Sequence, residues 1–341
     1  MTDEQEQLLD KVRSIIGQVY LVGGCVRDIL RGVEPKDYDF TTPLLPNDIE
    51  TAIRDAGLRP FVSGRQFGTI GCRIDGKHIE ITTFRTEEYD GKSRKPQVEF
   101  VRDITADLAR RDFTINAMAI RERGHLIDPF GGKADIDNHI IRAVNKPHER
   151  YHEDPLRMLR AGRFASQLGF QIEEATQHAA HKLAAEIIRV SKERWVRELD
   201  MILTSDDPGT GLRYLADTRL LVYMLPELAM QVGFDQDSPY HQLDLWEHSI
   251  KTAELSTKDV EIRWAALLHD VGKPYVRTVN KHGYSNYIDH DIVGAEMVWK
   301  VGKYLRWGNK RLERVYELVR THLTDDQNPI VEADSESRYK D

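Results

Sequence analysis

The sequence has little of what membranes and oxidising compartments require. Its 341 residues include only two cysteines, Cys25 and Cys72, which excludes a disulfide framework and a cysteine-rich zinc site. No apolar run approaches the roughly 20 residues that a membrane-spanning helix needs. Residues 1–6 are too acidic to begin a signal peptide. These absences predict a cytoplasmic protein without a membrane partner, built from roughly two or three domains.

The chain also lacks an excess of positive charge. Its 48 lysines and arginines are outnumbered by 56 aspartates and glutamates, for a formal net charge of -8. Such a balance argues against a protein that binds along a long nucleic-acid duplex. Residues 91–200 are nevertheless net positive, at +3, between a first part at -5 and a last part at -6. This distribution is compatible with an RNA held over a limited surface.

A glycine turn followed by two aspartates gives the first indication of chemistry. Residues 19–22 predict a short strand, Gly23 and Gly24 a turn, and residues 26–30 the start of a helix. Backbone N–H groups at such a turn can bind a phosphate, although a simple turn has the same sequence. Asp37 and Asp39 are two apart in a predicted strand, so both side chains point to one side. That spacing suits divalent cations such as Mg²⁺, which can promote an in-line phosphoryl displacement.

Two later stretches add arginines beside acidic side chains. In the first, Arg111 follows a second arginine and has the paired donors that a triphosphate needs, while Asp112 and Asn116 could position it or contact a sugar. In the second, Asp154 and Arg157 are three apart and are expected to share a helix face. Such a pair can read a base edge that carries an exocyclic amine, as C and A do. An ordinary helix salt bridge remains the alternative.

Four motifs together resemble the class II tRNA nucleotidyltransferase and poly(A) polymerase family. They are LVGGCVRD at 21–28, DYD at 37–39, RRDFTINAMA at 110–119 and EDPLRMLRAGRF at 153–164. The resemblance implies an α+β fold, in which a nucleotidyltransferase head with a small mixed sheet precedes helical neck and body regions. It also implies addition of nucleotides from CTP and ATP to the 3′ acceptor end of tRNA, with Mg²⁺ in the head and release of pyrophosphate.

The family resemblance assigns roles to individual residues. Catalysis falls to Asp37, Asp39 and Glu80, which lies on the second strand of a hairpin predicted over 67–84 and could equally be a solvated residue of its polar face. The implied nucleotide-binding residues are Gly23, Gly24, Arg27, Asp28, Arg111, Asp112, Asn116, Asp154, Arg157, Arg160 and Arg163.

A charged segment at 85–96 bears on which nucleotides are added. Its composition predicts a mobile loop, and the family resemblance implies that a loop at this place is needed to add the terminal A. The segment has its full length here, which favours addition of CCA or of A over addition of CC. Poly(A) synthesis stays open, because it shares the head motifs.

A second constellation of histidines and aspartates lies nearer the C-terminus. It comprises His248, His269 with Asp270 in the run HDVGKP, and His290. These side chains suit a first-row divalent metal that activates water. The pattern resembles the HD phosphohydrolase superfamily, in which a further downstream aspartate is expected; Asp325 and Asp326 are the candidates. A metallophosphohydrolase whose head only binds RNA is therefore the alternative from another class.

The motifs divide the chain into four parts. Residues 1–140 are predicted to form the head, 141–232 a helical neck and body that bind nucleobase and tRNA, and 240–328 an HD domain. Residues 329–341 are polar and are predicted to form a disordered tail. The identity of a metal in the HD domain and the oligomeric state do not follow from the sequence.

Overall fold

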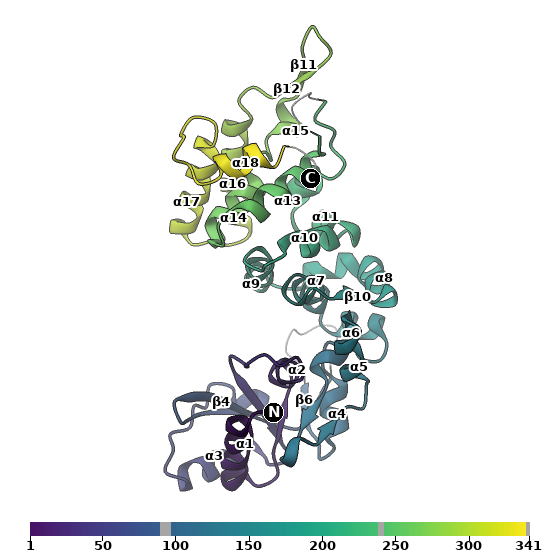
Figure 1. The fold of residues 1–341 in the computed structure, drawn as a ribbon, viewed down its shortest axis with the longest axis vertical. Coiled ribbons are helices and arrows are strands. Elements are labelled where there is room, and N and C mark those ends of the chain that lie inside the picture. The colour runs from purple at the N-terminus through teal and green to yellow at the C-terminus, as the bar shows by residue number, and fades with distance from the viewer. Residues whose placement is uncertain (89–96, 238–241, 339–341) are drawn as a thin grey trace. The chain divides into compact units, whose positions relative to one another are not determined.

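The computed structural model describes residues 1–88, 97–237 and 242–338. The chain divides into two compact units, the head unit Met1–Glu153 and the helical unit Asp154–Asp341, whose elements are labelled in Figure 1. Strands of a mixed sheet occur in the first unit and helices dominate the second, which confirms the predicted α+β class. Within the described residues no helix is long and apolar enough to cross a membrane.

The head unit contains short helices, strands and 3-10 turns. In chain order they are α1 (Asp3–Ile16), β1 (Tyr20–Val22), α2 (Gly24–Leu30), β2 (Tyr38–Thr42), α3 (Pro46–Asp55), η1 (Arg65–Phe67), β3 (Thr69–Ile74), β4 (Lys77–Thr83), β5 (Arg85–Glu88), β6 (Gln97–Phe100), α4 (Ile104–Ala109), η2 (Thr114–Asn116), β7 (Ala119–Ile120), η3 (Glu122–Gly124), β8 (Leu126–Ile127), α5 (Gly132–Asp137), β9 (Ile140–Ile141) and α6 (Pro147–Glu153).

A six-stranded sheet organises the head unit. Its strand order is β3-β4-β2-β1-β7-β8, with β2 and β4 parallel and the other pairs antiparallel. Strands β3 and β4 form the predicted hairpin, whose turn residues Asp75 and Gly76 have φ values of 50° and 78°. Both values are positive, as the favoured two-residue hairpin turn requires. Leu21, Phe40 and Ile79 are buried in the core of the unit.

The predicted loop at 85–96 is only partly a loop. Arg85–Glu88 and Gln97–Phe100 pair as the antiparallel strands β5 and β6, so the loop prediction is wrong for residues 85–88. Backbone hydrogen bonding between two strands outweighs the charged composition on which the prediction relied. The rest of the predicted loop, residues 89–96, lies outside the described residues.

The helical unit consists almost entirely of helices. Its elements are α7 (Leu156–Leu168), β10 (Gln171–Ile172), α8 (Glu174–Leu183), η4 (Ala184–Arg189), α9 (Lys192–Leu203), α10 (Pro208–Asp217), α11 (Leu220–Met224), α12 (Pro226–Ala229), α13 (Leu245–Leu255), α14 (Val260–Leu268), α15 (Lys273–Val276), β11 (Thr278–Val279), β12 (Ser285–Asn286), α16 (His290–Tyr304), α17 (Asn309–Thr321) and α18 (Val331–Glu336).

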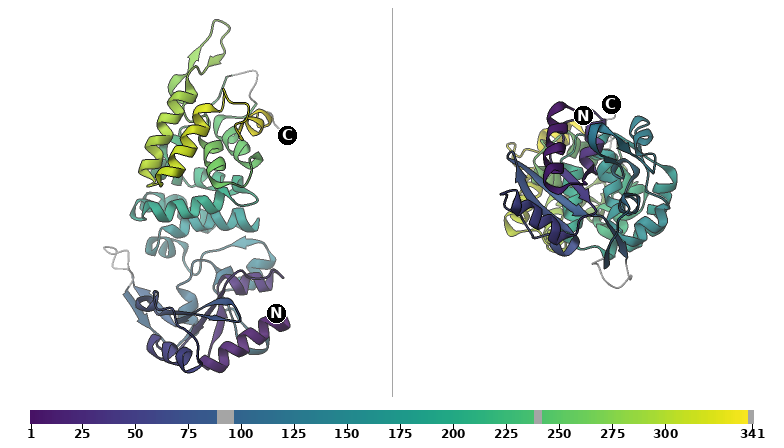
Figure 2. Two further views of the ribbon diagram at one scale, coloured as in Figure 1. Left: turned by 90° about the vertical axis from the view of Figure 1, so that its left-hand side faces the viewer. Right: turned by 90° about the horizontal axis from the view of Figure 1, so that it is seen from below.

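Helix α14 is the buried centre of the second half of this unit. Trp264 is fully buried on it, donates from Nε1 to Asp200 at 2.7 Å and meets Trp307 edge to face at 5.0 Å between ring centroids. Helices α16 and α17 lie side by side, as the yellow-green ribbons of Figure 2 show. The apolar run of α14 ends just before His269. Because this helix is buried, His269 and Asp270 also lie in the interior.

The predicted disordered tail is wrong for residues 331–336, which form α18; the end of that prediction, residues 339–341, lies outside the described residues. Ile330 is fully buried and packs with Ala253, Ile262 and Ala266. These apolar contacts fix a segment whose other residues are mostly polar, and composition alone therefore gave the wrong answer. The predicted boundaries at residues 140, 232 and 240 stay predictions.

Candidate active site and metal centre

The glycine turn of the head unit brings two predicted site residues together. Gly23 follows β1 with φ at 77°, and α2 begins at Gly24. A Cβ atom on Gly23 would lie 2.8 Å from Arg111 Nη1 and 3.9 Å from Asp39 Oδ2. Only glycine tolerates both this φ and this close approach. The turn therefore places bare backbone next to one guanidinium and one carboxylate.

Two further carboxylates, Glu80 and Asp37, act on Asp39 beside this turn. Parallel pairing of β2 with β4 aligns Asp39 with Glu80. Asp37 lies in a bend just before β2, so the prediction that both aspartates belong to one strand is wrong for Asp37. Removal of water by neighbouring atoms is the largest influence on the Asp39 carboxyl and raises its pKa; Arg111 opposes this, and Glu80 and Asp37 raise it further. Carboxylates that raise the pKa of one another in this way are close enough to interact electrostatically, and carboxylate oxygens are the ligands that Mg²⁺ prefers.

A hydrogen-bonded chain connects Arg27, Asn116 and Asp112. Arg27 donates to Asn116 Oδ1 at 2.9 Å and to both oxygens of Asp28, at 2.9 and 3.1 Å. Asn116 in turn donates to Asp112 Oδ1 at 3.1 Å, which also accepts the Phe113 N–H at 2.8 Å. The structure thus brings together four predicted nucleotide-binding residues as a network that fixes their side chains.

Sequence analysis missed Asp107, which lies behind the arginine pair. It is fully buried and forms ion pairs with Arg110 at 2.9 Å and with Arg111 at 3.5 Å. A single aspartate on a short helix carries no motif of its own. Its position four residues before Arg111 was the only available signal, because helical neighbours at that spacing meet.

Asp154 is not on the helix that carries Arg157, so the predicted shared helix face is wrong. It precedes Pro155, the N-cap residue of α7, and proline disfavours helical backbone in the residue before it. Asp154 Oδ1 accepts the Leu156 N–H at 3.2 Å, and Oδ2 pairs with Arg194 at 2.8 Å. Arg157 is itself buried, with 7% of its surface exposed.

The two further predicted arginines of α7 contact an aromatic ring. The guanidinium carbons of Arg160 and Arg163 lie 5.5 and 4.3 Å from the centroid of Phe164. Arg163 also forms an ion pair with Glu198 at 3.1 Å, with little of either side chain exposed. Arg163 is therefore bound by an acid within its own unit, although the family resemblance implied that it binds the nucleotide.

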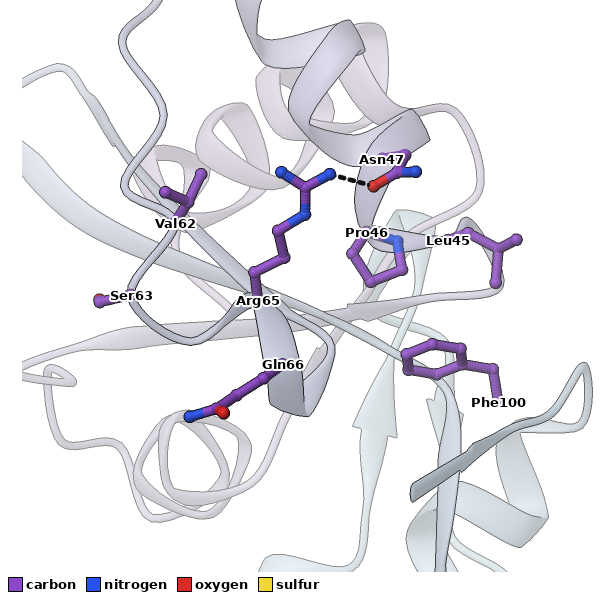
Figure 3. A pocket seen from close by; sticks show the side chains of 8 residues that line it. All are labelled: Leu45, Pro46, Asn47, Val62, Ser63, Arg65, Gln66 and Phe100. Atoms are coloured by element: carbon purple, nitrogen blue, oxygen red, sulfur yellow. Dashed lines mark hydrogen bonds between the residues drawn. The ribbon is translucent and has the colours of Figure 1, made fainter. Parts of the chain in front are cut away.

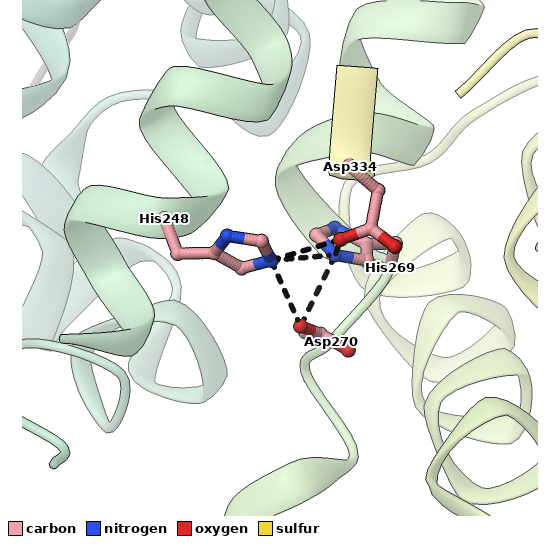
Figure 4. A group of neighbouring side chains, drawn as sticks. All are labelled: His248, His269, Asp270 and Asp334. Carbon is pink, nitrogen blue, oxygen red and sulfur yellow. Dashed lines mark hydrogen bonds and ion pairs between the residues drawn. The ribbon is translucent and has the colours of Figure 1, made fainter. Parts of the chain in front are cut away.

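A compact histidine and aspartate cluster occupies the interior of the helical unit. His248 from α13, His269 and Asp270 after α14, and Asp334 from α18 point toward one another (Figure 4). His248 Nε2 lies 3.3 Å from Asp270 Oδ2 and 3.1 Å from Asp334 Oδ1. All four ligand atoms lie within 4.8 Å of one another, in a spacing that could hold a metal ion.

Asp270 also belongs to a second group, with His290 and His322. His290 Nε2 lies 3.1 Å from Asp270 Oδ1, and His322 Nε2 lies 3.9 Å from the same oxygen. The first group approaches the other carboxylate oxygen of Asp270. One carboxylate therefore faces two sets of ligand atoms, one on each oxygen.

Backbone and hydroxyl groups orient the histidine rings. The Nδ1 atoms of His269, His290 and His322 lie 2.7, 2.6 and 2.7 Å from the carbonyl oxygens of Ala266, Tyr287 and Val319. His248 Nδ1 lies 3.0 Å from Ser337 Oγ. A proton on Nδ1 that is donated to a carbonyl leaves the Nε2 lone pair for a metal. The residues of the cluster therefore fit a first-row divalent cation.

The charges of this cluster are strongly coupled. Burial works to lower the pKa of His269, but Asp270 and Asp334 raise it to about 10. Burial also lowers the pKa of His322 to about 4, and the neighbouring His269 acts in the same direction. Burial works to raise the pKa of Asp270, yet His269 and Lys273 hold it well below its usual range. Lys273 Nζ lies 2.6 Å from Asp270 Oδ2.

The downstream aspartate of this cluster is Asp334, so the predicted candidates Asp325 and Asp326 are wrong. Both of those residues are exposed, whereas Asp334 is 7% exposed. The buried turn of α18 brings Asp334 inward, and the prediction of disorder there concealed it. His322, which sequence analysis did not assign to the site, is likewise a member.

A separate pocket of about 700 Å³ lies in the head unit (Figure 3). Arg65 extends across it and donates to Asn47 Oδ1. None of the predicted site residues lines it. Its lining residues are Leu45, Pro46, Asn47, Val62, Ser63, Arg65, Gln66 and Phe100.

Three family models match successive parts of the chain. Residues 19–142 match "Poly A polymerase head domain", residues 169–231 match "Probable RNA and SrmB- binding site of polymerase A", and residues 245–339 match "HD domain". The second and third matches fall in the helical unit, where the structure has the histidine and aspartate cluster.

Curated relatives and a solved structure are similar to the chain. A CCA-adding enzyme of Lacticaseibacillus paracasei is 42% identical over 68% of this chain and 57% of its own length. An A-adding tRNA nucleotidyltransferase of Deinococcus radiodurans is 35% identical over 89% of this chain and 68% of its own length. The Bacillus stearothermophilus CCA-adding enzyme in complex with CTP is 30% identical, with a TM-score of 0.67 over 99% of this chain and 82% of that chain. The chain thus spans little more than half the length of the first curated relatives it matches.

Proposed function

Since the chain belongs to the class II tRNA nucleotidyltransferase and poly(A) polymerase family and carries an HD domain, we propose that it adds CCA to the 3′ end of tRNA from CTP and ATP. In this reaction the terminal hydroxyl attacks the α-phosphorus of the nucleotide. The bond from that phosphorus to pyrophosphate breaks, and the hydroxyl proton passes to solvent. With tRNA as the substrate, the proposed location is the cytoplasm.

The observation that carries this proposal is the meeting of Gly23, Asp39 and Arg111, with Glu80 in register beside Asp39. We assign Asp37, Asp39 and Glu80 to holding Mg²⁺, which would activate the hydroxyl and stabilise the leaving oxygen. The bare turn at Gly23 and Gly24, with the Arg111 guanidinium over it, suits the triphosphate. Placement of this kind supplies much of the acceleration in phosphoryl transfer.

The remaining predicted residues receive supporting or base-selecting roles. Arg27 lies beside Gly24 and is held by Asp28 and Asn116, so we assign it to the triphosphate together with Arg111, in an orientation that these two partners fix. Base selection is assigned to Asp154 and Arg157, because acceptors and donors on these residues match the amine-bearing edges of C and A. Arg194, bound to Asp154 at 2.8 Å, would hold the carboxylate in place.

The decisive assay uses tRNA transcripts that end before CCA, after C and after CC. Each is incubated with Mg²⁺ and with CTP, ATP or both, and the products are resolved to single nucleotides. Addition of C, C and A followed by a stop supports the proposal. Addition of A to the CC-ended tRNA alone would indicate an A-adding enzyme. A long A ladder would indicate a poly(A) polymerase, and no extension would refute transfer.

We propose a second activity for the histidine and aspartate cluster, metal-dependent hydrolysis of a phosphate ester. The buried ligand atoms within 4.8 Å of one another carry this proposal. A bound divalent cation would activate the attacking water. The water attacks phosphorus, the ester oxygen leaves with a proton, and Lys273 neutralises Asp270 at 2.6 Å.

The two proposed activities can be separated by matched variants in different units. Asp39→Asn is expected to abolish nucleotide addition and to leave hydrolysis of p-nitrophenyl phosphate by the metal-loaded protein unchanged. Asp270→Asn is expected to do the reverse and to abolish binding of added Mn²⁺ or Ni²⁺, measured directly by metal analysis. Metal binding without hydrolysis of any phosphate ester would refute the second activity while leaving a structural metal.

A further inference from the structure

Asp107 is a buried acid that the proposed reaction does not use. It lies on α4, and its side chain is 0% exposed. Burial opposes its ionisation, but Arg110 and Arg111 hold the pKa of Asp107 below its ordinary value. A charged carboxylate in such a place is stable only where its partners compensate for the lost water.

The two oxygens of Asp107 have different partners. Oδ1 accepts from Arg110 at 3.0 and 2.9 Å and from the backbone N–H of Arg85 at 3.3 Å. Oδ2 pairs with Arg111 Nη2 at 3.5 Å. One carboxylate therefore joins the arginine pair to the first residue of β5.

The other end of the Arg111 guanidinium lies at the candidate active site. Its Nη1 atom is the nearest neighbour of the space above Gly23, and Asp39 is the next. Arg111 is also the strongest favourable charge acting on the Asp39 carboxyl. The guanidinium thus lies between two acids, Asp107 behind it and Asp39 in front. Loss of the rear partner would remove the carboxylate that pairs with Arg111 in the structure and leave the attraction of Asp39 unopposed.

Arg85 connects the same point to the β5–β6 hairpin. Its backbone is bound by Asp107, and its side chain donates to the carbonyl of Phe67, the last residue of η1. The side chain of Asp107 therefore fixes both the first residue of β5 and the Arg111 guanidinium.

We propose that Asp107 is a positioning residue for nucleotide addition, which keeps Arg111 over the glycine turn and prevents it from pairing with Asp39. This inference rests on the proposed function. It requires that Arg111 binds the triphosphate and that Asp39 binds Mg²⁺. Asp107 itself contacts neither the triphosphate nor the Mg²⁺ ion in this proposal.

The test compares Asp107→Asn with the wild-type protein. The substitution keeps the size of the side chain and removes its charge. We expect the KM for CTP and ATP to rise about tenfold, the effect of weakening one charge-assisted hydrogen bond from Arg111 to the triphosphate, with kcat changed less. We also expect the Mg²⁺ concentration at half-maximal rate to rise about threefold, because Arg111 then competes for Asp39. General loosening of the fold would not shift the Mg²⁺ requirement.

Two further comparisons show whether Asp107 acts through Arg111. Asp107→Asn combined with Arg111→Gln is expected to be no worse than Arg111→Gln alone, because residues that act as one unit are not additive. Glu50→Gln is the matched control, since it removes a carboxylate from Arg54 and Arg65 in the same unit and is expected to change neither KM nor the Mg²⁺ requirement.

The outcomes separate this inference from the function on which it rests. A wild-type protein that extends no tRNA refutes the proposed function. An active wild-type protein whose Asp107→Asn variant keeps its KM and Mg²⁺ requirement overturns the inference alone. Where circular dichroism shows that Asp107→Asn does not fold, Asp107→Glu replaces it. That variant keeps the charge but displaces the carboxylate, and is expected to raise both values in the same direction.

Discussion

The metal-free helical unit should lose stability as the pH rises from 7 to 9. His269 has a pKa of about 10 in the folded protein, because Asp270 and Asp334 outweigh the effect of burial, and an ordinary pKa of about 6.5 when unfolded. When the pKa of a group is higher in the folded than in the unfolded protein, its protonation stabilises the fold. This stabilisation is complete at a pH below the unfolded pKa, and it is lost as the pH rises toward the folded pKa. Asp270 and Asp334 stay charged in this range, because their pKa values are lowered.

The size of the effect follows from the shift of His269 alone. Each pH unit between the two pKa values costs up to about 1.4 kcal/mol, so the free energy of unfolding should fall by roughly 2 to 3 kcal/mol from pH 7 to pH 9. His322 contributes almost nothing here, because its pKa of about 4 leaves it neutral in the folded protein. A bound divalent cation should remove the dependence, because a coordinated imidazole carries no proton on the ligating nitrogen.

Tryptophan fluorescence during urea unfolding provides the assay. All five tryptophans lie after residue 153, so the signal reports the helical unit alone. The metal-free protein is compared at the two pH values with a Mn²⁺-loaded sample and with His269→Gln, which should lack the dependence. Equal unfolding free energies of the metal-free wild-type protein at pH 7 and pH 9, within about 0.5 kcal/mol, would refute this account of the cluster.

Three substitutions test the geometry of the two sites. Gly23→Ala should reduce nucleotide addition at least about a hundredfold, because its Cβ would displace Arg111 from a contact of 2.8 Å; normal addition by this variant would contradict the assigned role of the turn. Glu80→Gln should raise the Mg²⁺ concentration needed for addition, since it removes a charge aligned with Asp39; an unchanged Mg²⁺ titration would remove Glu80 from the site. Gly272→Ala should abolish metal binding by the helical unit, because its Cβ would lie 2.2 Å from the His290 carbonyl oxygen; metal analysis that finds full occupancy would show that α16 can shift without cost.

Much of the head site was predictable because local rules determine it. The dipeptide Asp75-Gly76 determines the hairpin turn. The turn sets the register of β3 and β4, and the register determines on which face of the sheet the Glu80 side chain lies. Parallel pairing of β2 with β4 could not be read from the sequence, yet it is what aligns Glu80 with Asp39. Asp107 was missed because its importance comes from contacts with Arg85, Arg110 and Arg111 and from burial, none of which leaves a pattern.

In the histidine and aspartate cluster, long-range packing determines more of the site than local sequence does. His269 and Asp270 were recognised from a local run, whereas Asp334 was overlooked because tertiary packing of Ile330 overrides the polar composition around it. Asp154 shows the effect of a local rule, because Pro155 disfavours helical backbone in the residue before it and α7 begins only after the proline. Sequence therefore pointed to residues within motifs and missed Asp107, His322 and Asp334, which only the packed fold brings to the two sites.

The ligand atoms of the cluster come from residues 248 to 334, a long span of chain that must close before they meet. Closing such a span has an entropic cost that local helix formation does not share. We therefore expect the site to be completed late in folding, after α13, α14 and α16 have formed. The rate at which refolding protein binds a spectroscopically visible ion such as Co²⁺ would therefore measure the final docking of α18. Metal binding would then report the last step in the folding of the helical unit.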